Sequence, residues 1–350
     1  MQVLLKLMLL CAFVLLKKTN VSANKLKSFH RHGDRTALET YNDDPNTLYW
    51  VKHGLGRLTD KGEQRMKHLG EFLRKRYGTF WPTKENLYIR SSREVRCVDS
   101  VKHLISGAYN NDFLSDPVKI NNIALEDDIM LSPGSSCPAF DQETIRVSRL
   151  PENQQWIKTY SLLVNKFGSQ HAITFLSLPR FLDNFELIKE YNLTMPNWIN
   201  DTIYQQINDY SHRRFTANVR TILQRRLRAG LFLKELYNQM NLIERNEKFN
   251  NIRIYSSSQL QVAEILTALG VYNNEPPPFG STIMFELYKT HLHPPMTFVK
   301  LYYLNDTYSE NPHLLTIEDC IEDEFCSFLK VKEQIEKYIP NDSRIECGLQ

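Results

Sequence analysis

The order of strand and helix patterns near the N-terminus constrains the fold more than any other feature of this sequence. A strand pattern over residues 27–32 runs into a turn, and an amphipathic helix pattern follows over 56–78, with Thr59 as the expected N-cap. A second strand over 86–92 and a second helix over 93–109 repeat this order. Strand–helix–strand–helix order predicts a parallel sheet covered by helices.

The middle of the chain changes character. Helical patterns dominate residues 145–250, which indicates a helical cap inserted into an α/β domain formed by 24–144 and 251–350. Two alternating segments, 282–290 and 296–306, predict antiparallel strands. The predicted fold is therefore α/β, with a mostly parallel sheet flanked by helices and a separate helical cap.

The first residues have the pattern of a secretory signal. Residues 3–16 form an apolar run that only Lys6 interrupts, and Val21 and Ala23 occupy the small-residue positions of a cleavage site. The run is too short to span a membrane comfortably, and no later run is long and apolar enough. We therefore expect residues 1–23 to be a signal peptide and the mature chain to be secreted and extracellular.

Composition excludes some classes of partner. The chain is 42% hydrophobic, which is enough for a sizeable core. Loss of the signal segment removes three lysines and no acid, so basic and acidic residues become equal in number. The net charge of the full chain therefore gives no reason to expect a nucleic-acid or membrane partner.

Cysteines and glycosylation signals agree with secretion. Five cysteines remain after cleavage, which in an oxidising compartment suggests two disulfides and one free thiol. Cys97 lies in a helical pattern and is expected to be the buried free thiol, and the other four allow three pairings. No cysteine or histidine spacing indicates a metal site. Four sequons lie in the mature chain, at Asn192, Asn200, Asn305 and Asn341.

The stretch "RHGDR" at 31–35 carries the clearest chemical signal. Two guanidinium groups so close together repel each other unless an anion lies between them, and they lower the pKa of an intervening imidazole. Arg31 and Arg35 would then bind a tetrahedral phosphate, with His32 as a neutral nucleophile. The alternative interpretation is a charged loop that pairs with acids elsewhere.

At these residues the sequence resembles the histidine acid phosphatases, a branch of the phosphoglycerate mutase-like superfamily. "RHGDRTA" matches the family motif R-H-G-x-R-x-P except at Ala37, and "LYIRSS" resembles the strand that carries a third phosphate-binding arginine, here Arg90. "SCPAFD" and the C-terminal "EC" resemble the family's long disulfide. The resemblance thus implies a Cys137–Cys347 bridge, and it leaves Cys320 to pair with Cys326.

The sequence departs from the family in the second half of the site. Members carry a His-Asp pair after a strand, whereas this chain has "YSSSQ", which places Ser258 on the histidine and Gln259 on the aspartate. His291 and His293 are considered as replacements, although their expected place is a turn between two strands. Asp34 is interpreted as a partner of the motif arginines. The catalytic acid is therefore predicted to be missing.

Two functions of different classes follow. The first is a secreted pseudoenzyme that binds small molecules between the α/β domain and the cap, without a cofactor. The resemblance extends to salivary acid-phosphatase-like proteins of blood-feeding insects, which implies biogenic amines or lipid mediators such as leukotrienes as ligands, with Tyr41, Trp50 or Trp156 available to stack on an amine. The alternative is a secreted acid phosphatase that works through a phosphohistidine intermediate at reduced efficiency. A third possibility is a surface protein without a ligand.

Overall fold

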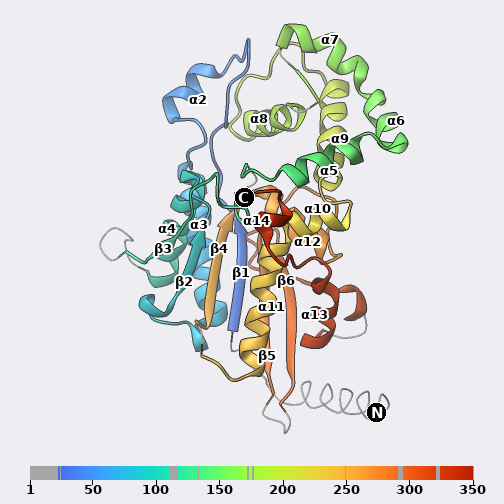
Figure 1. Cartoon of the computed structure of the whole chain (residues 1–350). Helices are drawn as coiled ribbons and strands as arrows, with labels where there is room; N and C mark the ends of the chain where they lie inside the picture. Colours follow the sequence, from blue (N-terminus) through green and yellow to red (C-terminus); the bar gives the residue numbers. More distant parts are fainter. Residues whose placement is uncertain are drawn as a thin grey trace.

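The chain folds into two lobes, one built on a sheet and one helical (Figure 1). The computed structural model describes residue 23 and residues 25–110, 117–132, 134–171, 173–175, 177–248, 250–290, 295–320 and 324–349. Apart from Ala23, the predicted signal peptide lies outside these residues, and so do His291 and His293. Within the described ranges, no helix has both the length and the apolar character needed to cross a membrane.

A mixed sheet forms the lower lobe, with the strand order β3-β2-β4-β1-β5-β6-β7 and β8 beside β6. The half that contains β3, β2, β4 and β1 is parallel, and β5 to β8 pair in antiparallel fashion. The strands are β1 (Lys25–Arg31), β2 (Tyr88–Ser91), β3 (Ile120–Asn121), β4 (Ile252–Ser257), β5 (Thr282–Lys289), β6 (Thr297–Leu304), β7 (His313–Leu315) and β8 (Cys326–Ser327). The α/β prediction and the predicted antiparallel pair β5–β6 are confirmed.

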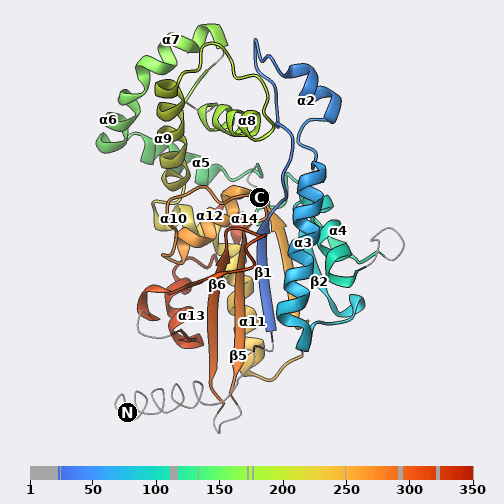
Figure 2. The ribbon, with the colours of Figure 1, turned by 180° about the vertical axis from the view of Figure 1, so that it is seen from behind.

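Helices cover both faces of this sheet because side chains alternate along its buried strands. Leu26 of β1 packs with α3 and α4 on one face, whereas Phe29 packs with α11, α12 and α13 on the other. Figure 1 and Figure 2 show α3 and α11 on opposite sides of the sheet. Thr59 caps α3 as expected, because its hydroxyl accepts a hydrogen bond from the Gly62 amide at 3.3 Å. The lower-lobe helices are α3 (Asp60–Tyr77), α4 (Val95–Tyr109), α10 (Ile222–Arg228), α11 (Gly230–Glu244), α12 (Gln259–Ala268), α13 (Phe328–Glu336) and α14 (Ser343–Glu346), with 3₁₀ turns at Gly78–Phe80, Lys84–Asn86 and Glu318–Cys320.

The upper lobe differs in its bounds from the predicted cap. Its core joins Phe181 and Phe185 to Trp50 of α2, a helix that comes from the first part of the chain. At the other end of the predicted segment 145–250, α11 packs on the sheet and not in the cap. The upper-lobe helices are α2 (Thr47–His53), α5 (Pro138–Ser148), α6 (Pro151–Thr159), α7 (Ser161–His171), α8 (Leu178–Glu190) and α9 (Asp201–Ala217).

The structure contains the two disulfides that the resemblance implied, one between residues far apart in the sequence and one within a short loop. Cys137 pairs with Cys347 across 210 residues, and Cys320 pairs with Cys326 across six. Among the described cysteines, Cys97 is the free one; it is 1% exposed, and burial raises its thiol pKa to about 12. A buried thiol of this kind is inert toward exchange, so it does not threaten the two bridges.

Candidate functional site

The site lies where three neighbouring strands end. β1, β4 and β2 are parallel neighbours, so their carboxyl ends meet at one edge of the sheet, below the upper lobe. Main-chain hydrogen bonds continue the pairing beyond the strands: the His32 amide donates to the Ser257 carbonyl at 3.1 Å, and the Ser92 amide donates to the Ser256 carbonyl at 2.9 Å. This geometry brings together residues 31–35, 92–96 and 258–259, which are far apart in the sequence.

His32 is held in one tautomer. Its Nδ1 lies 2.9 Å from the Gly33 carbonyl oxygen, and because a carbonyl can only accept, Nδ1 carries the proton. The ring is 2% exposed, and burial, together with the charges of Arg31, Arg35 and Arg96, holds its pKa well below the usual range. Nε2 therefore keeps a free lone pair even in acid, as a nucleophile requires.

Guanidinium groups surround this histidine. A cavity of about 450 Å³ is lined by His32, and the structure places Arg31 and Arg35 in it, as predicted from the motif. Arg35 donates to Asp183 of α8 at 3.0 Å, so the upper lobe closes one side of the cavity. The other cationic residues that line the cavity are Arg96, Arg180 and Arg214. An anionic group beside His32 would meet several positive charges in a partly dry site.

The third predicted phosphate-binding arginine, Arg90, does not line this cavity. Its guanidinium donates to the buried Asp128 at 2.8 Å, which is a structural ion pair within the lower lobe. Arg96 lines the cavity instead, because the chain turns after β2 and the first turn of α4 points toward His32. The sequence carried a signal for this, since Arg96 falls in the first turn of a predicted helix that follows a strand.

We expect Arg96→Gln to weaken the binding of inorganic phosphate by about 10- to 100-fold, the value of a lost charge-assisted hydrogen bond. Arg245→Gln is the matched control, because Arg245 lines neither cavity, its side chain is 71% exposed and it is paired with Glu247. Calorimetric titration of both variants measures the effect. Loss of binding in Arg90→Gln but not in Arg96→Gln would reverse this assignment.

Helix α3 fixes the loop that carries the motif. Gly62 lies so close to this loop that an added Cβ would be 2.0 Å from the Asp34 carbonyl oxygen, which no side chain can tolerate. The carboxylate of Asp34 pairs with Arg65 of α3, with Nε–Oδ2 at 2.5 Å, and with Lys61 at 3.8 Å. Asp34 therefore ties the loop to α3, and it acts on the motif arginine Arg31 through its charge without forming a salt bridge with it.

Ser258 and Gln259 begin helix α12 and line the cavity that contains His32. The Ser258 hydroxyl donates to the side-chain oxygen of Gln261 at 2.5 Å. The Gln259 amide group donates to the Pro277 carbonyl at 3.1 Å, which fixes which end of the amide is the donor. Neither side chain has a proton that it can release near neutral pH, so the second half of the site offers no general acid at these positions.

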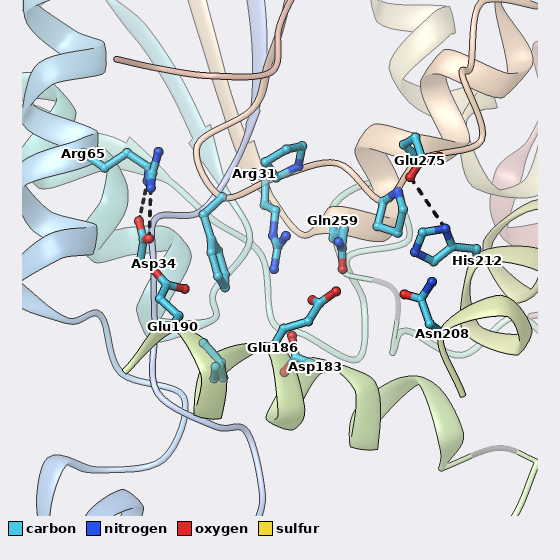
Figure 3. Close-up of a pocket in the computed structure, with 14 residues that line it drawn as sticks. Arg31, Asp34, Arg65, Asp183, Glu186, Glu190, Asn208, His212, Gln259 and Glu275 are labelled. Carbon is cyan, nitrogen blue, oxygen red and sulfur yellow. Dashed lines mark hydrogen bonds and ion pairs between the residues drawn. The ribbon is translucent and has the colours of Figure 1, made fainter. Parts of the chain in front are cut away.

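A second cavity, of about 410 Å³, adjoins the first and is the one drawn in Figure 3. Arg31, Asp183 and Gln259 line both cavities. Glu186 of α8 also lines the second cavity, and desolvation, followed by the nearby Asp183, raises its pKa to about 7. Sequence reasoning missed this cavity, because its carboxylates come from α8 and two loops that meet only in the fold. The acidic residues that line it are Asp34, Asp183, Glu186, Glu190 and Glu275.

The aromatic residues suggested for amine stacking lie elsewhere. Trp50 is fully buried in the upper-lobe core, Trp156 stacks on Tyr210 at 5.0 Å between ring centroids, and Tyr41 packs on Phe181. None of the three lines either cavity; Phe215 lines the cavity that contains His32, and Phe279, which packs beside Arg31 and His32, lines the second one. The sequon residues lie on the surface: Asn192, Asn200 and Asn341 are exposed, and Asn305 is half-buried.

Comparison with known proteins agrees with this geometry. Residues 16–304 match the family model described as histidine phosphatase superfamily (branch 2). The chain is 28% identical to prostatic acid phosphatase of Mus musculus, over 91% of this chain and 87% of that protein. It is 26% identical to lysosomal acid phosphatase of Bos taurus, over 91% and 79%.

The fold is shared with solved structures of lower identity. The phytase from Citrobacter braakii superposes with a TM-score of 0.65 at 13% identity, covering 93% of this chain and 99% of that one. The family model covers most of the sequence, and the motif at 31–35 lies inside the matched range. The chain therefore belongs to branch 2 of the histidine phosphatase superfamily.

Proposed function

We propose that this chain is a secreted acid-phosphatase-like protein with a lost or impaired phosphatase site, which binds small molecules in the cavities between its two lobes. The ligands proposed are biogenic amines, lipid mediators such as leukotrienes, or both. The observation that carries the proposal is Gln259, an amide that lines the cavity beside His32 where a phosphatase needs an acid. The two disulfides support an oxidising, extracellular location.

An amide at position 259 should slow phosphate ester hydrolysis, because the reaction needs a proton donor there. Transfer of the phosphoryl group to His32 must expel an alkoxide, which leaves slowly unless it receives a proton. General acid catalysis contributes about 10²–10⁴-fold, and loss of one donor to the phosphoryl oxygens costs about 10²–10³-fold more. Because both would serve one transition state, the two losses need not multiply. Either is large enough to leave binding as the main activity.

The lining of the cavities suits charged small molecules. The carboxylate of Glu186 is available to the ammonium group of an amine, and Phe279 offers an aromatic face in the same cavity. The guanidinium groups around His32 would bind the carboxylates of a lipid mediator. Neither half of the site requires a cofactor.

Two assays test the proposal. Calorimetry of the purified chain against serotonin, histamine, catecholamines and leukotrienes should detect binding of at least one ligand. Hydrolysis of alkyl phosphates at pH 5 should be very slow, while activated aryl esters, which need little protonation on departure, retain trace turnover. If none of these ligands binds, the result would favour a surface protein without such a ligand. Brisk alkyl ester hydrolysis, abolished by His32→Ala, would defeat the binding function.

The alternative is an active acid phosphatase, and the names of the relatives are equally consistent with it. The Nδ1–H tautomer of His32 and the surrounding guanidinium groups favour this second candidate. Glu186 would then be the substitute acid, since it lines a cavity with Gln259 and its pKa of about 7 keeps it protonated in acid. Under this alternative, Glu186→Gln should abolish alkyl phosphate turnover.

A further inference from the structure

We propose that the cavity in Figure 3 takes zwitterionic ligands in which a short linker joins a phosphate group to an ammonium group, with Arg31 holding the phosphate and Glu186 the ammonium. This inference rests on the proposed binding function, and it names the chemical class of the ligand. It follows from two opposite charges that face one cavity without pairing with each other.

Glu186 is the unpaired acid of this cavity. It has no ion-pair or hydrogen-bond partner among the residues that the structure describes, whereas three of the other four lining acids pair with an arginine or a lysine and the fourth lies beside a histidine. These pairs are Asp34 with Arg65, Asp183 with Arg35, Glu190 with Lys61, and Glu275 with His212. A carboxylate left without a partner inside a cavity is the group there that an added cation would stabilise most.

Arg31 is the matching unpaired cation. Its side chain is 4% exposed and points into the cavity (Figure 3), with the guanidinium 3.8 Å from the centre of the Phe279 ring. Nη1 donates to the Pro277 carbonyl at 2.7 Å, while Nε is buried without a partner. Within the described ranges no carboxylate forms a salt bridge with Arg31. The charges of Asp183, Glu186 and Asp34 act on Arg31 from a distance, but none of these carboxylates forms a salt bridge with it, so the guanidinium can still bind an anion that enters the cavity.

The arrangement favours a ligand with both charges. Arg31 reaches the cavity from β1 and Glu186 reaches it from α8, so they face each other across the space between the lobes (Figure 3). An amine alone would satisfy Glu186 and leave Arg31 unpaired, and inorganic phosphate would do the reverse. Arg31 also lines the cavity with His32, so a phosphate held there lies within the reach of the other guanidinium groups.

A pair of ligands isolates the ammonium contact. Phosphoethanolamine and ethyl phosphate share the phosphate and the two-carbon chain, and they differ in the ammonium group. Calorimetric titration of the native chain at pH 8 should show phosphoethanolamine binding about ten-fold more tightly or better, the value of one charge-assisted contact. Glu186→Gln should remove this preference without weakening ethyl phosphate, because the loss of a carboxylate near Arg31 favours an anion there. Glu333→Gln, an exposed acid on α13, is the control and should keep the preference.

The preference should also depend on pH. The carboxylate form of Glu186 is the one that attracts the ammonium, and its pKa of about 7 means that the ratio of the two affinities rises between pH 5.5 and pH 8.5. The ammonium group lowers the second pKa of the phosphate in phosphoethanolamine relative to ethyl phosphate, so the same titration of Glu186→Gln supplies the baseline from which the rise is measured. The charged or titratable groups that face Glu186 are Arg31, Asp183, Lys189, Glu190, Tyr204 and His212.

The outcomes separate this inference from the proposed function. Equal binding of the two esters by the native chain, or a preference that survives Glu186→Gln, would overturn the zwitterion assignment and leave the binding function standing. Failure of every ester and every amine to bind would overturn both. Lysophosphatidylethanolamine serves as a third ligand that identifies the source: tight binding that Glu186→Gln weakens supports a lipid headgroup, and tight binding of phosphoethanolamine alone supports a soluble ester.

Discussion

Replacing Ser258 with histidine and Gln259 with aspartate should raise the hydrolysis of alkyl phosphates by at least about 100-fold, because it restores a proton donor to the departing alcohol. Both native residues line the cavity beside His32 and are half-buried, so the larger side chains have space to enter it. Steady-state kinetics with a simple alkyl phosphate near pH 5 measures the gain. The increase should be smaller for aryl esters, whose leaving groups need less help.

Two controls make this result specific. The variant Ser258→His with Gln259→Asn has the same shape without the acid, and it should recover much less activity. Adding His32→Ala to the restored variant should abolish turnover, since the phosphoryl group then has no nucleophile to receive it. A restored variant that stays inactive, although it folds and binds phosphate, would show that Gln259 does not occupy the position of the acid.

Removing the Cys137–Cys347 disulfide, with both cysteines changed to serine, should lower the free energy of unfolding by about 2–4 kcal/mol. The bridge closes a loop of 210 residues, and it therefore restricts the unfolded chain strongly. Urea denaturation followed by circular dichroism, with and without the bridge, measures the difference.

The second disulfide supplies the matched comparison. Cys320 and Cys326 are six residues apart, so their bridge restricts the unfolded chain much less, and its removal should cost less stability. Equal losses for the two bridges would mean that contacts in the folded state, rather than the length of the closed loop, decide the effect.

The sequence predicted those parts of the fold that depend on local pattern. The strand–helix–strand–helix order, the Thr59 cap and the β5–β6 pair all follow from periodicity and turn chemistry within a few residues. The limits of the upper lobe could not be predicted in this way. Helices α2 and α11 have apolar faces that would suit either lobe, and only the packing partners decide that α2 joins the cap and α11 covers the sheet.

In the candidate site too, the residues that follow a local motif were predicted, whereas those placed by distant packing were not. The family resemblance predicted that residues 31–35 and 258–259 form two halves of one site, and the structure brings them together because each segment follows one of two parallel strands. Arg90 was a reasonable choice from its motif, but its side chain pairs with Asp128, whose position depends on a distant loop. The role of Glu186 could not be predicted from the sequence, because acidic residues are common on amphipathic helices. Its place in a cavity depends on residues from other elements, such as Arg31 and Phe279, that lie opposite α8 in the fold.

The position of β4 in the middle of the sheet has a consequence for biosynthesis. β1 and β2 do not touch each other; both pair with β4, which begins at Ile252, after the whole upper lobe has been made. Until β4 is made, a nascent chain therefore exposes one edge of β2, which has only the short β3 on its other side, and β1 has no partner at all; exposed strand edges of this kind promote aggregation. A fragment that stops before residue 252 lacks the strand that pairs with both β1 and β2, so it should aggregate more readily than the full chain.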